Sequence, residues 1–167
     1  MGVTYTTTSA ATYVPIATTT LASAAASYTF SSIPSTYTDL VLVISGTAAG
    51  ADSLKVQYNG DTATNYSYTI LYGTGSAAGS LGSANNSLLQ IGTISTTQIT
   101  SITQIQNYSN ITTYKTNISR SNDSSSQVNT SVGLWRSTAA INSIKIATVS
   151  NNLSIGSTFT LYGILGA

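Results

Sequence analysis

Carboxylates are the only side chains in this sequence that could carry acid–base catalysis by the usual routes. Four aspartates are present, Asp39, Asp52, Asp61 and Asp123, and the chain contains no glutamate, histidine or cysteine. Two carboxylates at a set separation suffice for glycoside hydrolysis, so an Asp-dependent glycan depolymerase is the one enzyme class to weigh. The missing histidine and cysteine remove the commonest general base, the thiol nucleophile and the usual zinc ligands.

The surroundings of the aspartates favour a structural role instead. All four lie at predicted turns or strand ends, where an Asp side chain accepts hydrogen bonds from backbone N–H groups. We therefore predict that they shape turns, that the protein is not an enzyme, and that no residue is catalytic.

One polar loop offers ligands of the kind that calcium binds. Asn59, Asp61, Thr62 and Asn65 supply hard oxygen atoms within a short stretch. Calcium loops usually concentrate several carboxylates, and this loop has one. A plain Asn-Gly turn with local hydrogen bonds is therefore favoured over a weak calcium site, and neither a metal nor a cofactor is predicted.

Aromatic side chains have two competing interpretations. The chain has eleven tyrosines and one tryptophan, and an apolar ring with a polar tip suits both core margins and subunit interfaces. Trp135 is predicted to anchor the core, with stacking on a sugar as the alternative. The tyrosines that alternate with polar residues are assigned to core margins: Tyr28, Tyr58, Tyr68 and Tyr162.

A second group of residues is predicted to form interfaces. Its members flank predicted loops, lie in the N-terminal segment, or are arginines that could pair with aspartates of a partner. These interface candidates are Tyr13, Pro15, Tyr66, Tyr72, Tyr108, Tyr114, Arg120 and Arg136.

The charge balance restricts the partners. Only 5% of residues are charged and the formal net charge is +1, whereas about 25% is typical of globular domains. Five Lys and Arg residues against four acidic ones are too few positive charges to bind a polyanion, so nucleic acid is not an expected partner. No apolar run approaches the roughly 20 residues of a membrane span. Low net charge gives little self-repulsion and favours a homo-oligomer.

Alternating runs predict an all-β protein. Roughly ten short strand candidates, separated by Gly, Asn and Ser clusters, indicate an antiparallel β-sandwich that is jelly-roll-like. Its core is expected to include Leu42, Ile44, Val56 and Phe159. Residues 27–167 are predicted to form this domain. Residues 1–26, rich in Thr, Ser and Ala, are predicted to be an extended arm or edge strand that is ordered by adding to a neighbour.

Three local features carry expectations of their own. Asn59-Gly60 predicts a hairpin that joins a strand ending near Tyr58 to a strand over residues 66–72. The Gly-, Ser- and Ala-rich stretch 73–86 predicts a long loop. The spacing of Ile99, Ile102 and Ile105 fits neither plain strand alternation nor a helix, and a β-bulge is expected there.

Several segments together resemble a known group of proteins. These segments are SYTFSSIPSTYTDLVLVISG, YNGDTATNYSYTILYGTGS, NYSNITTYKTNISRSN, GLWRSTAAINSIKI and GSTFTLYGI, within residues 13–164. They resemble small virion structural proteins of tailed bacteriophages, cyanophages among them. Similar segments occur both as short proteins and as terminal modules of longer tail-associated proteins.

This resemblance implies a non-enzymatic role in a virion. The leading expectation is a capsid decoration, or cement, protein that forms a homotrimer and binds the phage major capsid protein where capsomers meet. The alternative is a tail-fibre head or receptor-binding tip that contacts tail proteins and recognises host-surface glycans with its loops. In either case the expected location is the virion, on the capsid surface or on the tail.

Overall fold

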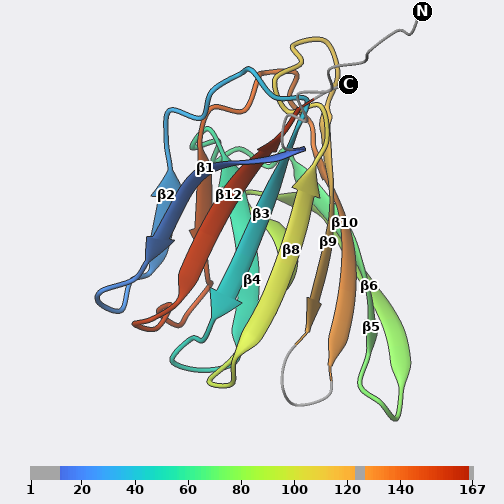
Figure 1. Cartoon of the computed structure of the whole chain (residues 1–167). Coiled ribbons are helices and arrows are strands. Elements are labelled where there is room, and N and C mark those ends of the chain that lie inside the picture. The colour runs from blue at the N-terminus through green and yellow to red at the C-terminus, as the bar shows by residue number, and fades with distance from the viewer. Residues whose placement is uncertain (1–11, 123–126, 166–167) are drawn as a thin grey trace, which may run out of the picture.

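The computed structural model describes residues 12–122 and 127–165, and within them it contains twelve β-strands and no helix. The strands form two antiparallel sheets that pack face to face (Figure 1). The prediction of an all-β antiparallel sandwich is thereby confirmed, while its finer jelly-roll assignment stays a prediction. Among the described residues no helix is long and apolar enough to cross a membrane.

The larger sheet has eight strands, and every neighbouring pair is antiparallel. Its order is β1 (Tyr13–Thr20), β12 (Thr158–Ile164), β3 (Asp39–Gly46), β8 (Ile99–Ile105), β9 (Lys115–Asn122), β10 (Val128–Trp135), β5 (Tyr66–Gly73) and β6 (Ala78–Asn86).

The smaller sheet has four strands and is also antiparallel. Its order is β2 (Ser27–Phe30), β11 (Ile144–Ala147), β4 (Asp52–Tyr58) and β7 (Leu89–Ile94). Strand β7 lies against the inner face of β8, β9 and β10, whereas β6 is exposed along most of its length.

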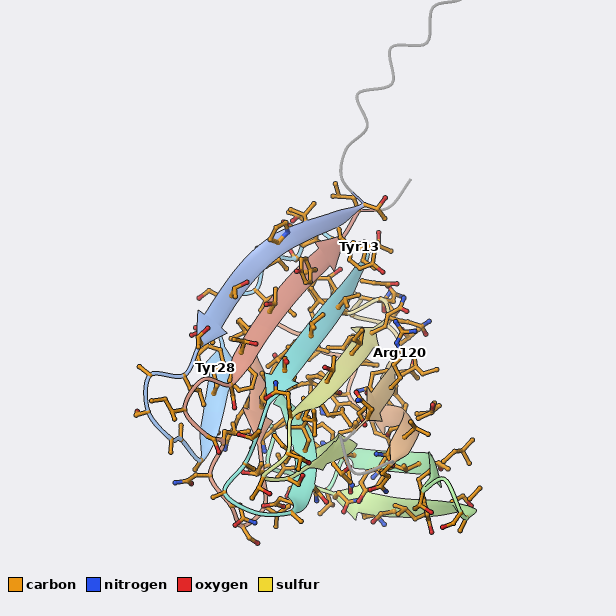
Figure 2. The ribbon with its side chains drawn as sticks, turned by 60° about the horizontal axis from the view of Figure 1, so that its bottom comes forward. Tyr13, Tyr28 and Arg120 are labelled. Atoms are coloured by element: carbon orange, nitrogen blue, oxygen red, sulfur yellow. The ribbon has the colours of Figure 1, made fainter. Side chains whose placement is uncertain are left out.

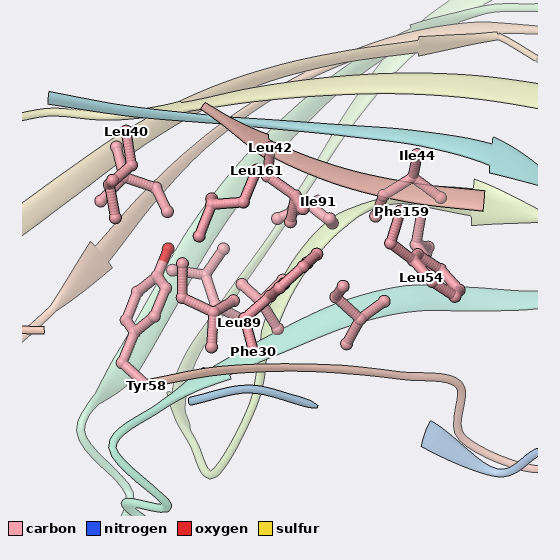
Figure 3. Close-up of a cluster of buried hydrophobic side chains, with 14 of the residues drawn as sticks. Phe30, Leu40, Leu42, Ile44, Leu54, Tyr58, Leu89, Ile91, Phe159 and Leu161 are labelled. Carbon is pink, nitrogen blue, oxygen red and sulfur yellow. The ribbon is translucent and has the colours of Figure 1, made fainter. Parts of the chain in front are cut away.

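The apolar core lies between the sheets where β3 and β12 face β4 (Figure 3). Side chains alternate along a strand, so Leu40, Leu42 and Ile44 of β3 point inward together. The four residues expected in the core, Leu42, Ile44, Val56 and Phe159, are all fully buried, which confirms that prediction.

The predicted N-terminal arm is described only from residue 12 onward. Residues 13–20 form β1, which is an edge strand of the large sheet and pairs with β12 of the same chain. Ile16 and Ala17 of this strand pack against the core. The part of the arm before residue 12 lies outside the described residues.

The expected hairpin at Asn59-Gly60 is wrong, although the turn itself is present. Asn59 and Gly60 have φ values of 54° and 66°, and Asp61 N donates to Tyr58 O at 2.9 Å. However, β4 belongs to the small sheet and β5 to the large one. The turn therefore begins a crossover between the sheets.

Two other expectations are also corrected. Residues 78–86, expected in a long loop, form β6 and pair with β5, because small residues suit an exposed edge strand that has no core to fill. Strand β8 pairs with both neighbours without a register shift, so no bulge is present. Ile99 and Ile105 face inward, and Ile102 lies on the opposite face.

Candidate functional site

The described aspartates hold turns together, as predicted. Asp39 accepts hydrogen bonds from Asn107 N at 2.8 Å and Gln104 Nε2 at 3.3 Å. Asp52 accepts backbone N–H groups from the loop after β11 and from its own neighbour, at 2.7–3.1 Å. Burial raises the pKa of the Asp52 carboxyl, but these four backbone donors outweigh burial and leave the pKa below its ordinary value. Asp123 lies outside the described residues.

The loop considered for calcium is closed by internal hydrogen bonds. Asp61 accepts from Ala63 N at 2.9 Å, Asn65 Nδ2 at 2.9 Å and Trp135 Nε1 at 2.7 Å. The Asn59 side chain donates to a carbonyl at 2.8 Å and accepts from two backbone N–H groups. These groups act as turn and loop braces, and no cluster of three or more His, Cys, Asp or Glu side chains occurs in the described chain.

Trp135 is part of the core and is not exposed for stacking on a sugar. Its side chain is 2% exposed and stacks on Tyr66 with ring centroids 6.2 Å apart. Tyr58 packs against both rings. The predicted core role of Trp135 is confirmed, and its burial removes the sugar-stacking alternative for this surface.

The interface candidates divide into buried and exposed residues. Tyr66 and Tyr108 are fully buried within the single chain, so their assignment to an interface is corrected. Tyr66 is buried because β5 pairs with β10 and the Tyr66 ring stacks on Trp135 in the core. Tyr108 is buried because its ring belongs to the core cluster and its hydroxyl donates to the carbonyl of Pro34.

The remaining candidates reach the surface in different places. Tyr13, Pro15, Tyr114 and Arg120 are exposed. Tyr72 is half-buried and lies across Gly79 of β6. Arg136 is held within the chain, where it donates to Ser67 Oγ, Thr64 O and Asn85 Oδ1 at 2.6–3.3 Å.

Tyr13 and Arg120 share the outer face of the large sheet, the face turned away from β7 (Figure 2). Strand pairing places the side chains of this face in rows across the sheet. One row contains Leu71, Thr130, Arg120, Ile102 and Val43, and the next contains Thr69, Val132, Ile118, Gln104 and Val41.

Many of these outer side chains are apolar and exposed. Leu71, Val128 and Val132 are 59%, 60% and 53% exposed, and Ile118 is 46% exposed. They lie on the neighbouring strands β5, β10 and β9. A contiguous exposed aliphatic patch of this kind is typical of an interaction surface.

The outer face is hollowed rather than flat. A hollow of about 550 Å³ lies over β8, β9, β10 and β5, and a second of about 330 Å³ lies over β1, β3, β8, β9 and β10. Ile102, Arg120 and Thr130 line both. We call the two hollows together the outer groove.

The lining of the second hollow indicates that the sheet is concave there. Tyr13 and Thr130 both line it, although β1 and β10 are five strand positions apart in the sheet order. In a flat sheet that separation is roughly 24 Å. The face must therefore curve to bring both residues to one hollow.

The inner face beneath the groove explains the curvature. Where β3 and β12 carry Leu, Ile and Phe, the central inward positions of β8, β9 and β10 carry small polar residues. These are Ser101, Thr103, Asn117, Ser119, Ser121, Asn129 and Ser131, all buried.

Small inward side chains let β7 approach closely. A Cβ atom added at Gly92 of β7 would lie 2.5 Å from Ser121 Oγ, and one added at Gly133 of β10 would lie 2.5 Å from Leu89 Cδ1. The central strands of the large sheet can therefore lie close to β7, and the outer face of the large sheet is concave at this point.

Hydrogen bonds between the sheets satisfy most of this polar interior. Ser131 Oγ donates to Gln90 O at 2.8 Å, and Asn129 Nδ2 donates to Thr93 Oγ1 at 3.2 Å. Within the described residues two buried atoms, Ser101 Oγ and Asn117 Oδ1, have no hydrogen-bond partner. The interior of this region is thus polar while its outer face is apolar.

Comparisons with known proteins give no family. No family model matches the chain, and no curated protein matches it. Among solved structures, it is similar to Scytalido-glutamic peptidase in complex with a peptide-based transition state analog, at 9% identity and a TM-score of 0.28, over 86% of this chain and 66% of that chain.

Two further structures show weaker likeness. The PL-14 alginate lyase from Aplysia kurodai matches at 9% identity and a TM-score of 0.26, over 81% of this chain and 72% of that chain. The T=1 particle derived from infectious bursal virus matches at 12% identity and a TM-score of 0.12, over 89% of this chain and 39% of that chain. TM-scores this low carry no information about the function of this protein.

Sequence reasoning found Arg120 and Tyr13 but missed the aliphatic wall between them. Ile118, Val128 and Val132 alternate with Asn and Ser, and the sequence pattern would place the aliphatic side chains inward. The signal that could have located the wall is the run of small polar residues at every second position of β9, which fits a closely packed inner face.

Proposed function

We propose that this protein is a non-enzymatic structural protein of a tailed-bacteriophage virion, a capsid decoration protein that binds between capsomers through its outer groove. The observation that supports this most directly is the reversed polarity of β9 and β10. Asn117 and Ser131 are buried, while Ile118 and Val132 are exposed. Exposed aliphatic side chains favour association because contact with a partner removes them from water.

The energy available from this patch suits an assembly protein. Covering Leu71, Ile118, Val128 and Val132 yields roughly 1 kcal/mol for each half-exposed side chain. Association costs at least about 4 kcal/mol in lost rigid-body freedom. One groove therefore binds weakly by itself, whereas several copies acting together on a shell bind strongly. Self-association as a homotrimer is part of the proposal, and the net charge of +1 opposes it little.

The test is loading onto particles from which the protein has been removed. We expect recombinant chain to bind them at a copy number that follows the number of capsomers. Val128→Thr and Ile118→Thr, one in each hollow of the groove, should reduce loading while leaving the melting temperature nearly unchanged, since both side chains are exposed. Val149→Thr is the matched control, because Val149 is 60% exposed but lies in the loop after β11.

Three results would overturn the proposal or one of its parts. Absence of the protein from purified particles would remove the virion role altogether. A copy number that follows the symmetry of the tail would replace decoration with the tail-associated role. Loading of the Val128→Thr and Ile118→Thr proteins equal to that of the wild type would show that the outer groove is not the attachment surface.

A further inference from the structure

Arg120 lies in the middle of the outer groove and has no partner charge within residues 12–122 and 127–165. Its side chain lines both hollows, and among the described residues it forms no hydrogen bond or ion pair. An arginine remains protonated at any physiological pH. The neighbouring positions in its row are Thr130 on one side and Ile102 on the other.

Covering this arginine has a chemical consequence. Any partner that fills the groove removes water from the guanidinium, and a buried charge without a counter-charge is strongly unfavourable. A carboxylate resolves this, because its two oxygens match the planar guanidinium fork. Complementarity of charge therefore requires an acidic group at the centre of the occupant.

The walls beside Arg120 define what must flank that acid. Leu71 lies two strand spacings away on one side, and Ile102 lies one spacing away on the other. Strands in a sheet are about 4.8 Å apart, and an extended chain presents a side chain to the same face every 6–7 Å or so. A segment that crosses the strands along the groove thus meets apolar walls on both sides of its acid.

We propose that the outer groove binds an extended protein segment that carries one carboxylate flanked at alternate positions by aliphatic side chains. This inference rests on the proposed binding function of the same groove and names the chemistry of its partner. The carboxylate pairs with Arg120, and the flanking side chains cover Leu71 and Val128 on the side of β10 and β5 and Ile102 on the side of β8.

An acidic polysaccharide fits the groove less well. Sugar rings pack best on flat aromatic faces, whereas the walls beside Arg120 are aliphatic. Two tyrosines are among the residues that line the groove: Tyr72 in the first hollow and, in the second, Tyr13, which packs edge-on against Tyr162 with centroids 6.2 Å apart. The methyl-rich walls match the side chains of a peptide.

The experiment is selection of a displayed random-peptide library on the full chain, followed by affinity measurements on a synthetic selected peptide. We expect enriched peptides to share a central Asp or Glu with Val, Ile or Leu two positions away on each side. Arg120→Gln should weaken binding at least roughly tenfold, and replacing the acid of the peptide by its amide should do the same. The two changes combined should reduce the affinity little more than either change alone.

Matched variants separate this contact from general charge and from folding. Lys145→Gln removes one positive charge from β11 of the small sheet and should leave the affinity unchanged. Arg120→Lys keeps the charge without the planar fork and should bind with intermediate affinity. Thermal melting of each variant shows whether it is folded, because Arg120 is exposed and its replacement should not unfold the protein.

Several outcomes would overturn the inference. These are an enriched set without an acid, equal binding by Arg120→Gln, or no enrichment at all. A glycan array on which only uronic-acid glycans bind, in an Arg120-dependent way, would replace the peptide by a polysaccharide. Particle loading that is unchanged by Arg120→Gln would reject this partner chemistry while sparing the virion role. Acid-dependent peptide binding by a protein that is absent from particles would reject the virion role and keep the partner chemistry.

Discussion

The indole nitrogen of Trp135 donates a hydrogen bond to Asp61 Oδ2 at 2.7 Å and so links the end of β10 in the large sheet to the turn after β4 in the small sheet. The same carboxylate accepts from Asn65 Nδ2 and Ala63 N. Because Trp135 is buried, its N–H has no access to bulk water as a substitute. Asp61 therefore fixes the position at which the chain crosses between the sheets.

Replacing this carboxylate should destabilise the protein. Asp61→Ala is expected to lower the free energy of unfolding by about 2 kcal/mol, because a buried N–H group is left without an acceptor. Urea denaturation followed by circular dichroism measures the change in the wild-type and Trp135→Phe backgrounds. In the Trp135→Phe background the cost of Asp61→Ala should be smaller, and an equal cost in both backgrounds would show that the Trp135–Asp61 bond contributes nothing.

The aspartates also predict how stability depends on acid. Burial raises the pKa values of Asp52 and Asp61, but the hydrogen bonds to each carboxylate outweigh burial, so both pKa values lie below their ordinary range. A lowered pKa in the folded state gives stability that is complete above the unfolded value of about 3.9 and is lost as the pH falls through the folded value. The urea concentration at the unfolding midpoint should therefore decrease as the pH is lowered below about 4. Asp52→Asn should make this decline shallower, and an unchanged decline would reject the role of Asp52.

Buried tyrosines predict the behaviour in base. Burial raises the pKa values of Tyr58, Tyr66 and Tyr108 above the ordinary value. A raised folded pKa gives stability that is present below the unfolded value of about 10 and is lost as the pH rises beyond it. Phenolate absorbance should show these three of the eleven tyrosines ionising only as the protein unfolds. Ionisation of all eleven while the circular dichroism stays native would contradict this.

The fold class could be predicted because the strands of the apolar half follow ordinary alternation. Leu40, Leu42 and Ile44 are spaced by two residues, the period of a strand, but Val41 and Val43 between them are apolar too, so the spacing predicts a strand without deciding which set points inward. The partners of each strand could not be predicted in the same way. Asn59-Gly60 indicates a turn with positive φ, but whether the chain then pairs with β4 or crosses to the other sheet depends on contacts distant in sequence, such as the bond from Trp135 to Asp61.

The outer groove could not be predicted for a different physical reason. Alternation divides the residues of β9 into two faces, Asn117 with Ser119 and Ile118 with Arg120, but it does not say which face is covered. Hydrophobicity alone would bury Ile118. The structure buries the polar set instead, because β7 approaches so closely that only small side chains fit between the sheets.

The close approach of β7 predicts a contrast between two glycines. Gly133→Ala should destabilise the protein by about 1–3 kcal/mol, because its Cβ would meet Leu89 Cδ1 and Asn117 Oδ1 at 2.5 Å in a packed region. Gly82→Ala in β6 is the matched control, because its nearest neighbour would be 3.4 Å away. That change should be neutral or slightly stabilising. Equal melting temperatures for the two variants would show that the sheets can separate freely at β10.

The edge strand β1 leads to the last prediction. Tyr13–Thr20 pairs with β12 along its length, and Ile16 and Ala17 pack on the core. Deleting residues 1–20 should therefore lower the free energy of unfolding by at least about 2 kcal/mol relative to a chain that begins at residue 12, since a half-buried aliphatic side chain and a set of backbone hydrogen bonds are lost. Urea denaturation of the two chains measures this difference.

The same deletion should change the association of the protein. Loss of β1 leaves β12 as an unpaired edge, and an exposed edge strand pairs readily with another chain. Sedimentation velocity should then show new dimers or larger species for the chain without residues 1–20. A synthetic peptide with the sequence of residues 12–21 should suppress them by occupying the edge. A monomer of unchanged stability would show that β1 is dispensable, and it would also remove the basis for placing Tyr13 at the end of the outer groove.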